Sequence, residues 1–215
     1  MSRADEATLN PACTGLVVFD MLERYRSAIE EAGAIEPART LIHECRERGV
    51  PVLYARADHR EDGKDFATAV TDTDSQLRPW GHDNPRPTRP PHGSGSRELQ
   101  VIAELAPRPG DYDVPKHRWS AFYQTNLDLS LRTRGIDTVM ILGGSTHVGI
   151  ASTVYAGRDM DYSMVVIRDA CTGFNEQRDF FLERVFPRMC RVRSVAEAIA
   201  MLETGTIDPE ARRRS

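Results

Sequence analysis

Polar side chains stand where the apolar runs of this sequence end, and their types suit proton transfer. Asp20 closes the apolar run LVVFD at residues 16–20, and Lys116 closes the extended stretch DYDVPK at residues 111–116. A carboxylate and an ammonium brought close each favour the other's charged form, while burial opposes charge on both. Such a pair can hold or move a proton if the fold brings these two strand ends together.

A second group of small and polar residues follows the apolar run TVMILGG at residues 138–144. Gly144 and Ser145 leave room for a close approach to the backbone, and a helical pattern begins at His147. Backbone N–H groups at a helix start attract negative charge, so we expect donors for a developing negative charge there. Gly149 lies in the first turn of that helix, where glycine costs about 1 kcal/mol relative to alanine. Its presence therefore needs a reason.

Apolar runs alternate with amphipathic helical patterns along most of the chain. Strands are expected at residues 16–20, 50–56, 111–116, 138–144, 163–170 and 189–194, and helices at 23–48, 127–135, 147–161, 176–186 and 195–205. Continuous apolar strands separated by amphipathic helices predict a parallel sheet covered on both faces. Right-handed crossovers then give a three-layer, doubly wound, Rossmann-like α/β fold. Ligands bind at the carboxyl ends of such strands, where Asp20, Arg56, Lys116 and Asp169 are expected.

Residues 57–110 interrupt this alternation with many prolines and the stretch GSGS. Only SRELQVIAELAP, at residues 96–107, has a helical pattern there. A long irregular insertion in a compact domain is typically a binding loop, a lid or a linker. We therefore interpret residues 1–215 as a single domain in which 57–110 form an irregular insertion, serving as a lid, an interface arm or a flexible linker.

Charge and cysteine usage exclude several classes of protein. The formal net charge of −4 gives no pull toward nucleic acid or an anionic membrane. No apolar run approaches the roughly 20 residues needed to span a bilayer, and the first residues lack the apolar core of a signal peptide, so we expect a cytoplasmic protein. The four cysteines form no CxxC pair, so reduced thiols are expected at Cys13, Cys45, Cys171 and Cys190.

Three motifs together resemble the isochorismatase-like hydrolase family, which includes isochorismatases, nicotinamidases, N-carbamoylsarcosine amidases and ureidoacrylate amidases. LVVFDM at residues 16–21 is similar to the first strand of the family with its catalytic Asp. Residues 114–153 are similar to the strand that carries the Lys, the following helix and the strand before the nucleophile. Residues 163–174 are similar to the next strand. The resemblance implies a six-stranded parallel sheet with strand order 3-2-1-4-5-6. It also implies a homodimer or homotetramer and a non-proline cis peptide at Gly144–Ser145.

The chain departs from most of this family at one position. Most members carry a nucleophilic Cys in the first turn of the helix, and the matching position here is Gly149. Isochorismatases also have glycine there, in a His-apolar-Gly stretch similar to His147-Val148-Gly149. They protonate the methylene carbon of a vinyl ether with the family Asp, and water adds to the oxocarbenium ion. The resemblance therefore implies that Asp20 is the general acid, that Lys116 orients it, and that Gly149 makes room for the substrate.

Further residues are candidates for binding the substrate or a developing negative charge. They are Gly144, Ser145, His147, Val148, Trp119, Phe122 and Arg56. We expect no cofactor and no metal. Asp58, His59, His82 and His92 are weaker candidates for metal ligands, because the resemblance to nicotinamidases implies a metal near this region. Their spacing does not reproduce the Asp-x-His pattern of nicotinamidases, and solvated loop histidines are more common than ligands.

Three functions stay open at this point. The first is a cofactor-independent hydrolase of a small metabolite, in its most concrete form a vinyl ether hydrolase without a covalent intermediate. The second is an amide C–N hydrolase in which Asp20 activates water in place of a thiol. The third is a lapsed enzyme that binds a metabolite or a partner.

Overall fold

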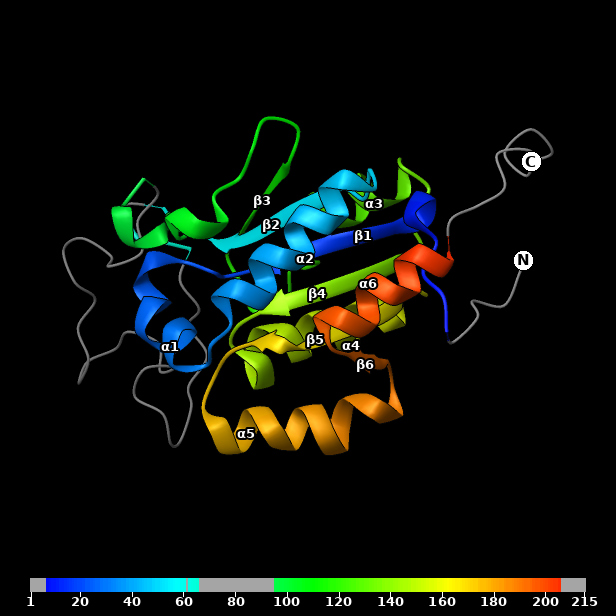
Figure 1. Cartoon of the computed structure of the whole chain (residues 1–215). Helices are drawn as coiled ribbons and strands as arrows, with labels where there is room; N and C mark the ends of the chain where they lie inside the picture. Colours follow the sequence, from blue (N-terminus) through cyan, green and yellow to red (C-terminus); the bar gives the residue numbers. More distant parts are fainter. Residues whose placement is uncertain (1–6, 61, 66–94, 206–215) are drawn as a thin grey trace.

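The computed structural model describes residues 7–60, 62–65 and 95–205, which form one six-stranded parallel sheet with helices on both faces (Figure 1). The strands are β1 (Thr14–Phe19), β2 (Val52–Ala57), β3 (Tyr112–Lys116), β4 (Thr138–Gly143), β5 (Ser163–Cys171) and β6 (Arg191–Arg193). Their order across the sheet is β3-β2-β1-β4-β5-β6, so the chain changes direction across the sheet between β1 and β4. The predicted fold class and strand order are confirmed.

The central strand β1 is buried along its whole length and contributes to two cores. Leu16 and Val18 belong to one core, and Val17 and Phe19 belong to the other. This alternation follows from the two-residue period of a strand, which sends successive side chains to opposite faces. The unbroken apolar run LVVF is therefore what a strand covered on both faces requires.

Helices cover the two faces in separate layers (Figure 1). They are α1 (Arg26–Glu31), α2 (Ile35–Glu47), α3 (Leu127–Arg132), α4 (Ala151–Asp159), α5 (Asn175–Phe180) and α6 (Val195–Thr204). Buried side chains of α2 and α6 complete the core that contains Leu16, and those of α3 and α4 complete the core that contains Phe19. The strand ends at the reversal point are thus fixed from both sides.

Three expected helices are interrupted. The helix expected at 176–186 is divided into α5, a π-helical turn over Phe181–Val185 and a 3-10 turn over Phe186–Arg188. The expected helix 23–48 is split into a 3-10 turn, α1 and α2, because Gly33 takes a left-handed φ of +63° between the two α-helices. The expected helix 96–107 is replaced by two short 3-10 turns, because Val101 between them forms an antiparallel bridge with Leu22. The helix expected from His147 begins one residue earlier, as a π-helical turn over Thr146–Ile150 that leads into α4.

Most of the insertion, residues 66–94, lies outside the described residues, and so do His82 and His92. Its proposed role as a lid or an interface arm is therefore not tested. The described part after it is packed into the domain, since Ile102 and Leu105 are buried in the same core as α2. Within the described residues, no helix is both long and apolar enough to cross a membrane.

Candidate active site

Asp20 and Lys116 form a buried ion pair at the carboxyl edge of the sheet. Lys116 Nζ donates to Asp20 Oδ2 at 2.6 Å, and the two side chains are only 6% and 9% exposed. Asp20 Oδ1 accepts a hydrogen bond from the backbone N–H of Ala57 at 2.7 Å. The Lys116 ammonium also lies 4.4 Å from the centroid of the Phe19 ring, within cation–π range. The two strand ends meet as the sequence predicts, while their catalytic role stays a prediction.

Three neighbouring strands hold this pair. Phe19 on β1 lies opposite Ala55 on β2, and Ala57 at the end of β2 lies opposite Lys116 on β3. The chain leaves β1 at Asp20 with a φ of +47°, a region that few residues other than glycine adopt. Such a backbone conformation persists only where its surroundings enforce it, and it is frequent at functional sites. The position of the Asp20 carboxylate is therefore set by the sheet.

Two glycines allow the end of β4 to pack against neighbouring backbone and side chains. Gly143 has a φ of +112°, and a Cβ there would lie 1.9 Å from the carbonyl oxygen of Phe19. A Cβ on Gly144 would lie 1.9 Å from Thr172 Oγ1. The next peptide bond, between Gly144 and Ser145, is cis, as the resemblance implies. The small residues noted in the sequence thus serve close packing of this turn.

The surroundings of Gly149 contradict the expectation that this glycine makes room for the substrate. The absence of a side chain there does not open a space for substrate, because a Cβ would lie 2.3 Å from Cε1 and 2.6 Å from Cζ of Phe19. The Phe19 ring occupies this place and is almost completely buried. A thiol at position 149 is therefore excluded by packing unless Phe19 moves. Sequence reasoning missed Phe19, whose only signal was its place directly before Asp20.

The start of the following helix also differs from expectation. The Thr146 N–H donates to the carbonyl of Thr172 at 2.9 Å, and the Val148 N–H donates to the carbonyl of Ser145 at 3.3 Å. Ser145 Oγ lies 3.2 Å from His147 Nδ1. The Thr146 and Val148 N–H groups are thus engaged within the protein, so they are not the donors expected for a developing negative charge.

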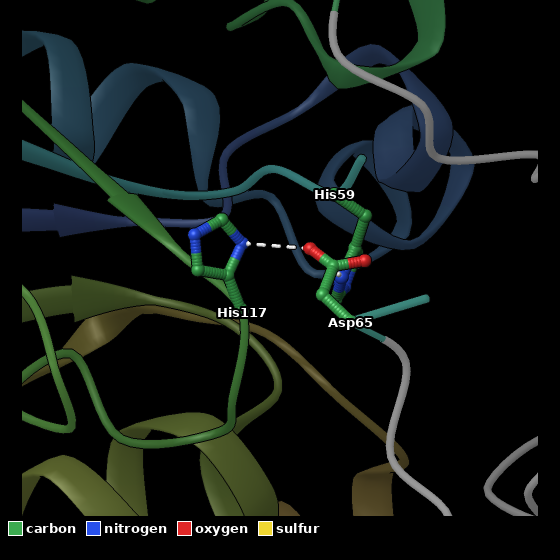
Figure 2. A group of neighbouring side chains, drawn as sticks. All are labelled: His59, Asp65 and His117. Carbon is green, nitrogen blue, oxygen red and sulfur yellow. Dashed lines mark ion pairs between the residues drawn. The ribbon is translucent and has the colours of Figure 1, made fainter. Parts of the chain in front are cut away.

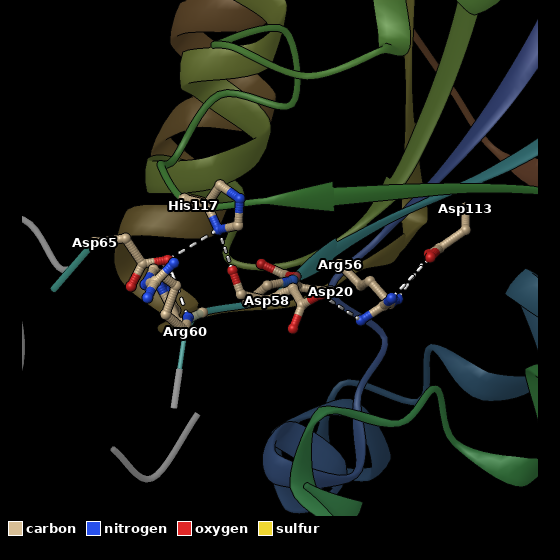
Figure 3. Close-up of polar contacts among 9 residues, drawn as sticks. Asp20, Arg56, Asp58, Arg60, Asp65, Asp113 and His117 are labelled. Atoms are coloured by element: carbon tan, nitrogen blue, oxygen red, sulfur yellow. Dashed lines mark hydrogen bonds and ion pairs between the residues drawn. The ribbon is translucent and has the colours of Figure 1, made fainter. Parts of the chain in front are cut away.

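Arg56 is held by two carboxylates. Its Nε and Nη2 donate to the two carboxylate oxygens of Asp113 at 2.6 and 2.7 Å, and its Nη1 lies 3.5 Å from Asp58 Oδ2 (Figure 3). A bidentate contact of this kind is among the strongest that arginine makes. The guanidinium charge is therefore balanced within the protein, and Arg56 is not poised to bind a substrate carboxylate as expected.

The other candidates lie in different surroundings. Phe122 stacks on Tyr162 with ring centroids 5.3 Å apart and belongs to a core, so it is a packing residue. Trp119 is 54% exposed. The Asp169 carboxylate accepts from the Val195 N–H at 2.9 and 3.2 Å, so this strand-end acid serves the start of α6.

The cysteines are poorly suited to nucleophilic chemistry, which requires a thiolate. Burial raises the pKa of Cys171 to about 12, that of Cys190 to about 12 and that of Cys13 to about 11. Burial also raises the pKa of Cys45. All four are free thiols, as expected, and near neutral pH they are held in the protonated form.

A cluster that sequence reasoning missed lies beside the acid–ammonium pair. His59 follows the end of β2, His117 directly follows Lys116, and Asp65 lies near both imidazoles (Figure 2). Burial lowers the pKa of His59 and so favours its neutral form. His59 was interpreted as a solvated loop residue, and nothing in the spacing of Asp65 or His117 connects them to it before the chain is folded.

The fold and the buried pair define a Rossmann-like α/β protein with an acid and an ammonium at the carboxyl edge of its sheet. Residues 14–197 match the isochorismatase domain, and the chain belongs to the isochorismatase family. The family membership that the sequence motifs predicted is confirmed.

Relatives place the chain among hydrolases. It is 31% identical to the uncharacterized isochorismatase family protein YecD of Escherichia coli O157:H7, over 90% of this chain and 98% of that protein. It is 30% identical to the ureidoacrylate amidohydrolase RutB of Cronobacter turicensis, over 79% of each chain. The structure of N-carbamoylsarcosine amidase from Thermoplasma acidophilum matches with a TM-score of 0.64 and 31% identity, over 85% of this chain and 96% of that one.

Proposed function

We propose that the protein hydrolyses the vinyl ether of a small carboxylate-bearing metabolite, with isochorismate as its most concrete substrate, and forms no covalent enzyme intermediate. The observation that carries the proposal is the buried Asp20–Lys116 pair beside a helix start where Phe19 fills the place of a nucleophile. The pair supplies a proton donor, and the packing at Gly149 leaves no thiol to attack.

The reaction needs one proton transfer to carbon. In the proposed step Lys116 transfers the proton of its 2.6 Å hydrogen bond to Asp20, and the Asp20 carboxyl delivers it to the methylene carbon of the enol ether. The C=C electron pair takes up this proton, which leaves an oxocarbenium ion stabilised by the ether oxygen. Water adds to that ion and returns a proton to Asp20, and the hemiketal collapses to pyruvate and an alcohol. Lys116 keeps the carboxyl group oriented throughout.

The closest competing function is hydrolysis of an amide C–N bond by water that Asp20 activates. Its support is the similarity to RutB and to N-carbamoylsarcosine amidase, both named for hydrolysis of amide-type bonds. A lapsed enzyme that only binds a metabolite is the third possibility. These three functions differ in product, so one assay series separates them.

The test measures pyruvate release from isochorismate by coupling it to lactate dehydrogenase. Wild-type protein is expected to release pyruvate. Asp20→Asn is expected to lower kcat about 10²–10⁴-fold, because the isosteric amide cannot donate the proton. Lys116→Gln is expected to lower it as well. Asp179→Asn, which alters an exposed carboxylate paired with Arg178, is the matched control and should retain activity.

Two further readings decide between the alternatives. In D2O, proton delivery to carbon places one deuterium in the methyl group of the trapped product. Absence of pyruvate release by folded wild-type protein contradicts the proposal. Ammonia release from ureidoacrylate or N-carbamoylsarcosine would then favour the amide hydrolase, and activity in neither assay would favour the binding protein.

A further inference from the structure

We propose that His59, Asp65 and His117 form a binding site for one divalent transition-metal ion such as Zn²⁺ (Figure 2). The three side chains turn toward one another from the segments that follow β2 and β3 (Figure 2). Two imidazole nitrogens and one carboxylate oxygen are a ligand set that zinc and its neighbours in the first transition row accept.

The distances suit a single ion. His59 Nδ1 lies 3.5 Å and His117 Nδ1 lies 3.3 Å from the same Asp65 Oδ2. Two ligands that each bind zinc at roughly 2.1 Å with a tetrahedral angle between them lie about 3.4 Å apart. One ligand atom from each of the three residues lies within 4.8 Å of the others. His117 Nδ1 also contacts the carbonyl oxygen of Asp58, so the His117 ring must turn away from that carbonyl to present a free nitrogen to the ion. The ion can then bind with side-chain adjustments and no movement of the strands.

The surroundings hold the carboxylate in place and leave it capacity to bind. The Arg60 N–H donates to Asp65 Oδ2 at 3.1 Å, and Arg118 Nη1 donates to the Asp65 carbonyl at 2.6 Å. Asp65 Oδ1 is buried without a hydrogen-bond partner among the described residues, a state that usually costs free energy. The Arg60 guanidinium is directed to Asp62 through two hydrogen bonds of 2.9 Å, so it does not neutralise Asp65.

The position of the cluster suggests what the ion would do. His59 lies two residues beyond Ala57, whose N–H binds Asp20, and His117 directly follows Lys116. Three protein ligands leave at least one coordination position of zinc for water or a substrate atom. His117 is the most exposed of the three side chains, so an ion can reach the cluster from solvent on the His117 side. The ion would bind an oxygen or nitrogen atom of a small ligand next to the acid–ammonium pair.

Direct metal binding tests the site without any assumption about the reaction. Tag-free, chelator-treated full-length protein is incubated with Zn²⁺, desalted and analysed for zinc by mass spectrometry, and titrated with Zn²⁺ by calorimetry. We expect about one zinc per chain. His59→Asn and His117→Asn are each expected to weaken binding roughly tenfold or more, because each loses a ligand. Bound Co²⁺ should give visible d–d absorption in wild type that is lost in these variants.

Two controls make the result specific. His43→Asn alters an exposed histidine of α2 and should bind zinc like wild type. The His82→Asn/His92→Asn double variant should do the same. Far-UV circular dichroism checks that every variant is folded. No retained ion in wild type, or equal retention in His59→Asn and His117→Asn, overturns the proposal, as does loss of zinc from the His82→Asn/His92→Asn protein. None of these outcomes bears on pyruvate release.

Discussion

At the scale of single residues, Phe19 has two roles that depend on each other. Its ring fills the space that a side chain at position 149 would need, and its face lies under the Lys116 ammonium. Phe19 also directly precedes Asp20, so any shift of its ring acts next to the ion pair. The glycine at position 149 and the placement of the Asp20–Lys116 ion pair are therefore linked through one aromatic side chain.

This link predicts a strong coupling between positions 19 and 149. Gly149→Ala should destabilise the fold by about 1–3 kcal/mol, because its Cβ overlaps the Phe19 ring. Gly149→Cys should cost at least as much and bring no amidase activity. In the Phe19→Val/Gly149→Ala double variant the free energies of the single changes should not add, with a coupling of about 0.5–3 kcal/mol. Urea unfolding of the four proteins measures it, and additive effects would contradict the packing argument.

Individual site residues were predictable where their position at the end of a strand could be recognised from the sequence. Asp20 and Lys116 end apolar runs, and the rule that ligands bind at the carboxyl ends of parallel strands brings them together. Asp65 and Phe19 were not predictable, because an acid in a loop and an aromatic in a strand are ordinary residues until their neighbours are known. Arg56 and Asp169 were expected at the site, but Asp113 and the α6 backbone engage them first.

At the scale of elements, α6 shows how a polar sequence signal fixes a helix start. Ser194 Oγ accepts from the Glu197 N–H at 3.2 Å, and the Glu197 carboxylate accepts from the Ser194 N–H at 2.6 Å, which is a capping box. Asp169 on β5 satisfies the Val195 N–H as well. The start of α6 is thereby attached to the strand it covers.

Removal of this cap should lower stability without changing the site. Ser194→Ala is expected to lower the free energy of unfolding by about 1 kcal/mol, because the Glu197 N–H loses its acceptor. Ser194→Asp, which restores an acceptor, should recover most of the loss. Urea unfolding monitored by circular dichroism gives both values. A cost for Ser194→Ala near zero would mean that Asp169 alone is sufficient at this helix start.

Helices and strands were predicted well where the spacing of apolar residues and the position of a glycine indicate the same element. They were predicted poorly where pairing with a distant segment changes the local structure. The strands and α6 follow directly from apolar runs and from the stop at Gly205. The bridge between Leu22 and Val101 could not be foreseen, because it joins the segment directly after β1 to one that follows β2 and is far away in the sequence. That pairing replaces the helix expected at 96–107 with two 3-10 turns.

At the scale of the whole molecule, we retain the proposal of a homodimer or homotetramer. Phe174 and Phe180, at the two ends of α5, are 62% and 57% exposed. Exposed aromatic side chains that lie on one element commonly mark a contact surface. Phe180 lines a shallow pocket together with Arg184 and Arg188 from the turns that follow α5, so a contact there would have a charged border.

Light scattering coupled to size exclusion tests this proposal. We expect a mass of two or four times the 24.1 kDa chain for wild-type protein. Phe180→Asp should shift the mass toward the monomer, because a charge would be buried without a partner in the contact. Phe174→Ser is a milder companion variant. A monomeric wild type would contradict self-association, and an unchanged mass in both variants would place the contact elsewhere.

The order of the strands places the two members of the ion pair on strands that contribute unequally to the stability of the fold. The ammonium of the pair is contributed by β3, which lies at one edge of the sheet and, among the strands that the structure describes, pairs only with β2. Detachment of the five residues of β3 would leave both apolar cores almost complete, yet it would remove Lys116 from Asp20. Under the function proposed for this pair, a preparation with a normal unfolding temperature can still contain molecules without activity, so active-site titration is a better measure of its quality than melting.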